Sequence, residues 1–166
     1  IVLAFSISSE AQIMSPQASP LSKVEQKIGL SDFSIEYSRP GVKGREIFGS
    51  LVPYGEVWRT GANSNTIISF STDIKFGDVD VKKGKYALYS IPNKDSWELI
   101  LYSDTNNWGN PAEWDESKVV AKASAKVGEL PFLVETFTID FNGITDNGFN
   151  LELLWEKSYV ILPVSV

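Results

Sequence analysis

The chain contains no cysteine and no histidine. Disulfides, iron–sulfur clusters, the usual zinc sites and the Ser-His-Asp and Cys-His nucleophilic sites all need one or both of these residue types. Those sites are therefore excluded within this chain. Any catalysis would rest on carboxylates, Lys, Tyr, Ser or Thr, or on an oxygen-ligated metal. The composition favours a non-catalytic binding domain, and we expect no cofactor and no metal site.

Long apolar runs and an excess of positive charge are also missing. No stretch reaches the roughly 18 consecutive apolar residues that a membrane span needs. The net charge is −6 and the sequence pI about 4.7, so the long-range field repels phosphate backbones and anionic lipids. We expect no membrane span and no nucleic-acid partner, which leaves a small molecule, a glycan or another protein.

The first residues, "IVLAFSISSEAQ", pass from apolar to small side chains. This pattern is typical of the second half of a signal peptide with a cut before Gln12, although a native first strand is the alternative. We expect residues 1–11 to be a signal-peptide remnant, residues 12–20 a flexible lead-in, and residues 21–166 a single domain. The predicted location is the periplasm or the outside of the cell.

Most of the chain alternates apolar and polar residues with period two, which indicates half-buried strands. Within 96–103 both alternating sets are apolar, which is typical of an interior strand. The pattern predicts an all-β fold: an antiparallel β-sandwich of about nine strands with one long ordered loop and no long helix. The alternating segments are 32–38, 66–72, 79–81, 85–91, 96–103, 119–127, 135–141, 149–155 and 159–166.

Two turn signals and one ambiguous segment accompany these strands. Lys83-Gly84 and Asn147-Gly148 each lie between apolar runs and predict hairpin turns. Residues 21–29 fit two structures: Ser22 and Glu25 form a capping box for a helix, whereas Val24, Gln26 and Ile28 alternate as in an edge strand.

Residues 38–65 break the alternation, because seven Gly and Pro residues force bends there. The pattern allows at most a helical turn at 45–51 and a short strand at 56–60. Structureless loops of this length are uncommon in compact domains unless they are functional.

This segment also holds every arginine of the chain. Of fifteen basic residues, only Arg39, Arg45 and Arg59 are arginine, and the other twelve are lysines spread along the sequence. A guanidinium is a flat fork of donors that binds carboxylates, phosphates or several carbonyls at once. The arginines therefore either hold the loop, by pairing with its acids and carbonyls, or line a pocket for an anionic or polyhydroxylated ligand.

A second loop, residues 104–118, carries two tryptophans among polar residues. Trp108 and Trp114 either fold back as plugs or stay exposed as surfaces that stack on a sugar or a partner. Trp58 in the first segment is more typical of a core residue than of a ligand platform. The candidate ligand-binding residues are Tyr37, Arg39, Arg45, Trp58, Arg59, Asn63, Asn65 and Trp108, and we name no catalytic or metal-binding residue.

Three sequence blocks resemble a family of exported bacterial domains of unknown function, DUF2911. They are "YSRP" at 37–40, "KGREIFGSLVPYGEVWRTGAN" at 43–63 and "KGKYALYSIPNKDSW" at 83–97, and the resemblance covers about residues 22–166. It implies an all-β exported domain and a strand at 24–30. It implies no activity, and only motif membership for Tyr37, Arg39, Arg45, Trp58, Arg59 and Asn63.

The sequence thus favours an exported binding domain whose arginine-containing loop forms a pocket for an anionic or glycan ligand. Two alternatives stay open. One is a carbohydrate-acting hydrolase or lyase that uses carboxylate or tyrosine chemistry. The other is a partner-binding protein of the cell envelope, for which a flat exposed aromatic patch would be the signature.

Overall fold

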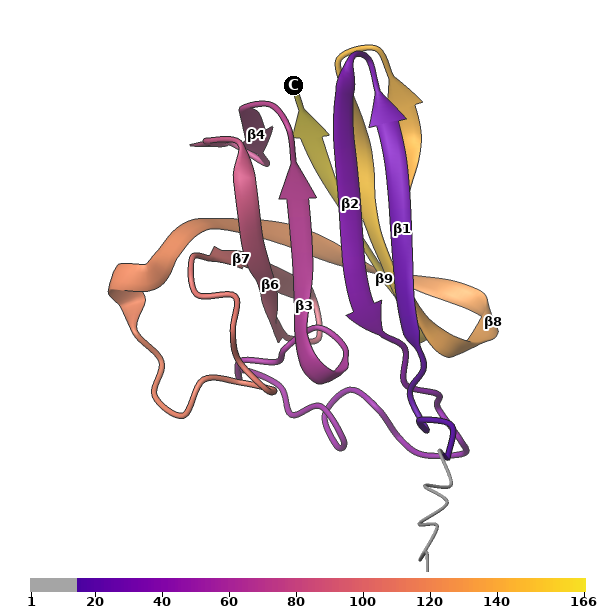
Figure 1. Ribbon diagram of the computed structural model, residues 1–166. Coiled ribbons are helices and arrows are strands. Elements are labelled where there is room, and N and C mark those ends of the chain that lie inside the picture. Colours follow the sequence, from indigo (N-terminus) through magenta and orange to yellow (C-terminus); the bar gives the residue numbers. More distant parts are fainter. Residues whose placement is uncertain (1–14) are drawn as a thin grey trace, which may run out of the picture.

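Nine β-strands and one short 3-10 turn form the fold in a computed structural model that describes residues 15–166 (Figure 1). The predicted signal-peptide remnant, residues 1–11, lies outside the described residues. The elements are β1 (Leu21–Ile28), β2 (Ser31–Ser38), β3 (Ala62–Phe70), β4 (Ile74–Phe76), β5 (Val79–Val81), β6 (Gly84–Pro92), β7 (Ser96–Tyr102), η1 (Glu116–Lys118), β8 (Val119–Thr145) and β9 (Gly148–Ser165).

The strands form one antiparallel hydrogen-bonded sheet in the order β1-β2-β3-β6-β7-β8-β9-β4-β5. Strand β8 is long enough to pair with β7 through its first part and with β9 through its later part, where bulges shift the register. Its course lets one sheet turn back over its own core (Figure 1). The predicted all-β antiparallel class is confirmed, and residues 21–28 form a strand, as the family resemblance implied.

The main core lies where the two parts of this sheet face each other. Phe33 of β2 contacts Phe141 of β8 and Phe149 of β9, with ring centroids 6.2 and 5.0 Å apart. Further along, Trp97 of β7 and Trp155 of β9 both contact Phe48, at 4.7 and 6.1 Å. Since Phe48 comes from the long irregular segment, part of that segment belongs to the core.

A second, smaller core covers the opposite face of β6 and β7. It consists of fully buried Ala87, Tyr89, Ile100 and Tyr102, with Trp114 packed on top. This explains why both faces of β7 are apolar, and the predicted interior position of that strand, between β6 and β8, is confirmed.

Several strand details differ from the sequence prediction. The segments 119–127 and 135–141 join into β8, and 149–155 and 159–166 join into β9, while β4 had no clear alternation. The Asn147-Gly148 signal does mark the β8–β9 turn, where Thr145 pairs with Gly148. The Lys83-Gly84 hairpin was wrong, because β5 pairs with β4 and β6 pairs with β3 and β7. A turn signal reports a change of direction but does not say which strands then pair.

Two irregular loops leave the strands at one end of the molecule: the segment 39–61 between β2 and β3, and the loop 103–115 after β7 (Figure 1). The first contains isolated bridges, including Trp58 with Ser90, but no helix or regular strand. Between residues 15 and 166, no helix is long and apolar enough to cross a membrane.

Candidate anion-binding site

Arg39 ties the start of the irregular segment to β8. Its Nε donates to the carbonyl of Phe137 at 2.9 Å, and its Nη2 donates to the hydroxyl of Thr138 at 2.7 Å. Hydrogen bonds from a charged donor are among the stronger ones in proteins. The Arg39 guanidinium therefore joins two strands that lie about a hundred positions apart in the sequence.

Tyr37, two residues earlier, makes a second link to β8. Its buried hydroxyl donates to the carbonyl of Ile139 at 3.2 Å and accepts from the amide of the same residue at 2.8 Å. Burial is the main cause that raises the pKa of the Tyr37 phenol, so the hydroxyl stays protonated near neutral pH. Tyr37 and Arg39 are thus engaged in contacts between strands.

Arg45 folds back on its own loop. Its Nε donates to the carbonyl of Val42 at 3.1 Å and its Nη2 donates to the carbonyl of Gly41 at 2.6 Å. These carbonyls lie in a segment that has no regular ladder to satisfy them. The hypothesis that the arginines hold the loop allowed them to pair with either acids or carbonyls. Arg39 and Arg45 bind carbonyl or hydroxyl oxygens.

Trp58 anchors the far end of the segment in the core. Its ring is stacked on Trp155, with centroids 5.8 Å apart and planes 14° apart, and its Nε1 donates to the carbonyl of Gly61 at 3.1 Å. Only 9% of Trp58 is exposed. Trp155 covers one face of the indole and little of the residue is exposed, so Trp58 can offer a ligand an edge but is a poor stacking platform.

Arg59 differs from the other two arginines. The residue is half-buried, and its Nε is one of two buried side-chain polar atoms that have no hydrogen-bond partner within residues 15–166. Native proteins rarely leave such a group unpaired, because an unsatisfied buried donor costs about 1–3 kcal/mol and more when it is charged. A guanidinium whose N–H groups lack partners can bind a carboxylate or phosphate through a pair of them, although the buried Nε of Arg59 would need a small shift of the side chain to be reached.

Arg59 lines a pocket of about 240 Å³ at this end of the sheet. Arg45 also lines it, so two arginine residues border the same space, and no acidic residue does so among the lining residues in the described part of the chain. The remaining walls are mostly apolar or small, and comprise Ser19, Pro40, Leu51, Val52, Trp58, Gly61, Ala62 and Trp155.

The backbone that follows Arg59 is strained. Thr60 has φ of 54°, a left-handed conformation that is uncommon for a β-branched residue. Its buried hydroxyl is hydrogen bonded to that of Ser90 at 2.9 Å, and its carbonyl accepts from the hydroxyl of Thr66 at 2.6 Å. At Gly61 an added Cβ would meet the carbonyl oxygen of Ser38 at 3.0 Å. Strain of this kind persists only where surrounding contacts impose it, and it clusters at functional sites.

The two asparagines of the motif hold neighbouring segments. Asn63, with φ of 58°, donates through Nδ2 to the carbonyl of Ser19 at 3.2 Å, and so binds the lead-in segment to the rim of the pocket. Asn65 is buried. In the amide orientation that gives both its side-chain oxygen and its nitrogen a partner, the nitrogen donates to the carbonyls of Thr105 and Asn107, at 3.2 and 3.1 Å.

The second loop lies directly against Arg59. A Cβ built on Gly109 would be 3.4 Å from the Nη1 of Arg59. The tryptophans of this loop have opposite environments: Trp114 stacks on Tyr102 at 4.6 Å, whereas Trp108 is 76% exposed. Trp114 is a plug over the second core, and Trp108 does not line the Arg59 pocket.

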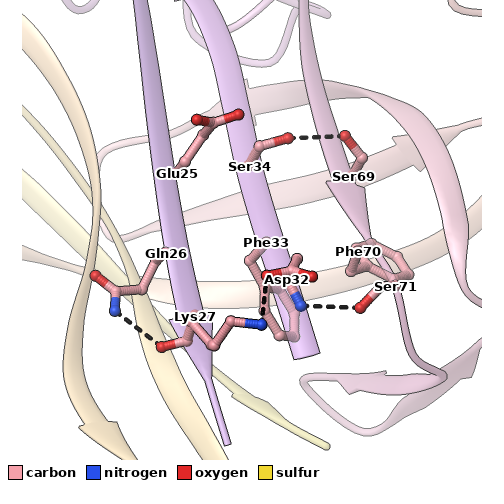
Figure 2. Close-up of a pocket in the computed structure, with 9 residues that line it drawn as sticks. All are labelled: Glu25, Gln26, Lys27, Asp32, Phe33, Ser34, Ser69, Phe70 and Ser71. Atoms are coloured by element: carbon pink, nitrogen blue, oxygen red, sulfur yellow. Dashed lines mark hydrogen bonds and ion pairs between the residues drawn. The ribbon is translucent and has the colours of Figure 1, made fainter. Parts of the chain in front are cut away.

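The molecule has a larger hollow of about 560 Å³, formed on the strands β1, β2 and β3 (Figure 2). Its polar groups already bind one another: Ser34 and Ser69 share a hydrogen bond of 2.9 Å, and Lys27 pairs with Asp32 at 2.9 Å. Both members of that ion pair are mostly exposed. Because its polar side chains have partners, this hollow is a weaker candidate site than the smaller Arg59 pocket.

Sequence reasoning missed several residues of the pocket, among them Ser19, Gly61 and Trp155. Gly61 lies in the quoted "WRTGAN" block and could have been named from it. Ser19 precedes β1 and Trp155 lies on β9, so both reach the pocket only through tertiary packing, which no local pattern indicates.

The fold and the pocket together define an all-β domain with an arginine-lined cavity at one end. The chain belongs to the family described as "Protein of unknown function (DUF2911)", which matches residues 19–164 and so confirms the resemblance seen in the sequence blocks. No curated protein and no solved structure matched the chain.

Proposed function

We propose that this protein is an exported domain that binds a small organic anion in the Arg59 pocket. The observation that carries the proposal is Arg59 itself: it lines a cavity that a second arginine also borders, and its buried Nε has no hydrogen-bond partner within residues 15–166. The other two guanidinium groups each have two oxygen acceptors within the protein. Arg59 is the one whose donors are left for a ligand.

The size and lining of the pocket support a compact ligand with an apolar body. A volume of about 240 Å³ corresponds to roughly eight waters at about 30 Å³ each, enough for a molecule as large as a single sugar acid. Pro40, Val52 and the edge of Trp58 would contact its carbon skeleton, while Arg59 would bind its carboxylate. A neutral sugar finds less support, because no exposed aromatic face lines the cavity.

Binding is favoured over catalysis by the residue types present. General acid–base chemistry requires a carboxylate, phenol or amine within hydrogen-bonding reach of the substrate. The lining residues between 15 and 166 include none of these groups. Export to the periplasm or beyond is proposed from the apolar-to-small start of the sequence.

Titration calorimetry with galacturonate, acetate, inorganic phosphate and glucose tests the proposal. We expect galacturonate to bind the wild type with one-site stoichiometry and glucose to give no heat. Arg59→Ala is expected to abolish the binding, and Arg59→Lys to weaken it strongly, because an ammonium lacks the two-pronged geometry. Lys94→Ala removes the same charge from an exposed position outside the pocket and should bind normally. Equal loss of affinity in Lys94→Ala and Arg59→Ala would reduce the effect to net charge and contradict the proposal.

A further inference from the structure

Trp108 is an exposed aromatic side chain on a well-held loop. Its exposed fraction is 76%, although a tryptophan can bury about 150–250 Å² and stabilise a protein substantially by doing so. No aromatic ring of the described chain pairs with it, whereas Trp114 of the same loop is stacked on Tyr102.

The loop around Trp108 is anchored on both sides. Asn65 donates to the carbonyls of Thr105 and Asn107, the hydroxyl of Tyr89 donates to the carbonyl of Gly109 at 3.4 Å, and Asn110 donates to the carbonyl of Val57 at 2.6 Å. The exposure of Trp108 is therefore imposed by its neighbours in the chain and is not a consequence of an unattached loop.

These anchors hold Trp108 close to the arginine of the pocket. A Cβ on Gly109 would lie 3.4 Å from the Nη1 of Arg59. The bond from that Cβ to its Cα adds about 1.5 Å and the step to the neighbouring Cα about 3.8 Å, so the Cα of Trp108 is within about 9 Å of that nitrogen. A ligand held by Arg59 that extends toward this loop would therefore pass close to Trp108.

We propose that Trp108 forms a second subsite and that the ligand is an acidic oligosaccharide. This inference rests on the proposed function of the Arg59 pocket. A sugar ring is apolar on its C–H face and polar at its edges, so it can stack on an indole while its hydroxyl groups stay in water. Trp108 is exposed in the way such a solvated, extended ligand requires, and the pocket itself has room for one charged sugar unit.

The test compares galacturonate with trigalacturonate by titration calorimetry on the full chain. For the wild type we expect the trimer to bind on the order of tenfold more tightly than the monomer, the size of effect that one aromatic stacking contact gives. Trp108→Ala is expected to remove this gain and leave monomer affinity unchanged, and Trp108→Phe to keep part of it. Phe132→Ala, at another exposed aromatic, is the matched control and should keep the full gain.

Each result decides between the two proposals. If the trimer gains nothing over the monomer, or if the gain survives in Trp108→Ala, the second subsite is overturned while the Arg59 pocket stands. If neither saccharide binds, the proposed function fails for sugar acids and the subsite fails with it. Since Trp108 is exposed, its variants should keep the wild-type melting temperature, and that measurement separates lost binding from lost folding.

Discussion

The three arginines show how the same side chain serves different ends at neighbouring positions. Arg39 joins β2 to β8, Arg45 binds carbonyls of its own loop, and Arg59 lines a pocket with its Nε unpaired. All three lie in the same irregular segment, which glycines interrupt throughout. The difference arises from what the folded chain brings to each guanidinium.

That difference predicts that the two arginines contribute unequally to stability when no ligand is present. Arg39→Ala removes two hydrogen bonds from a charged donor and should lower the free energy of unfolding by about 1.5–3 kcal/mol, which lowers the melting temperature by several degrees. Arg59→Ala removes a donor that has no partner and should leave the melting temperature nearly unchanged or raise it. Differential scanning calorimetry of both variants checks this. A larger loss in Arg59→Ala than in Arg39→Ala would show that Arg59 is itself a structural contact.

Tyr37→Phe tests the other connection to β8. The substitution keeps the ring in the core but leaves both the amide and the carbonyl of Ile139 without their hydroxyl partner. We expect the free energy of unfolding to fall by about 1–3 kcal/mol with an unchanged denaturant slope in urea. A variant as stable as the wild type would mean that the two backbone groups find other partners.

For individual residues, the sequence pointed to the arginine-containing segment but not to the role of each arginine. The confinement of arginine to 39–59 was visible in the composition alone, and Trp58 was placed in the core from its residue type. Which guanidinium would be occupied depends on Phe137 and Thr138, some hundred residues away. No local pattern carries that information, and the same is true of the contact between Arg59 and Gly109.

The loop 103–115 and the short turn η1 that follows it are held by several ionised groups. Asp104 binds Lys118 at 2.9 Å, and this hydrogen bond, with that from the amide of Asn106, lowers the pKa of the Asp104 carboxyl. Hydrogen bonds from Ser117 lower the pKa of Asp115 in the same way. A carboxyl whose pKa is lower in the folded state adds stability above its unfolded pKa and loses it as the pH falls through the folded value.

We therefore expect the loop to loosen in acid before the sheet unfolds. As the pH falls from about 5 to about 3, the range in which carboxyl groups titrate, hydrogen exchange of the amides in 104–118 should accelerate after correction for the intrinsic rate. The amides of β7 should stay protected over the same range. Asp104→Asn, which cannot ionise, should show part of this loosening already at pH 7. Protection of the loop that is independent of pH in the wild type would contradict the assigned role of these carboxylates.

The strands themselves could largely be predicted, because period-two alternation marks half-buried strands directly. The prediction was weaker where a strand continues through a bulge. Inside β8, the exposed Phe132 and Leu133 interrupt the alternation, so the sequence pattern divided this one strand into two. It failed for Lys83-Gly84, where the chain crosses between two parts of the sheet. Pairing between distant strands is decided by the core as a whole.

For the whole molecule, the packing predicts a single unfolding transition. Trp58, Trp97 and Trp155 from three separate segments form one aromatic cluster, and strand β8 belongs to both parts of the sheet. Neither part can separate without breaking that cluster. Thermal unfolding followed by tryptophan fluorescence and by far-ultraviolet circular dichroism should therefore give coincident curves. Two separated transitions would show that the parts of the sheet unfold independently.

We propose that Arg59 is the arginine left for a ligand, and because the chain has only three arginines, each guanidinium can be followed separately. In a ¹H–¹⁵N spectrum of the arginine Nε–H groups, variants at each position assign the three peaks. During titration with galacturonate, the Arg59 peak should move along a saturating curve while the Arg39 peak, whose Nε is bound to the carbonyl of Phe137, stays in place. If the Arg59 peak does not move, or if all three move together without saturation, the account of the site is wrong.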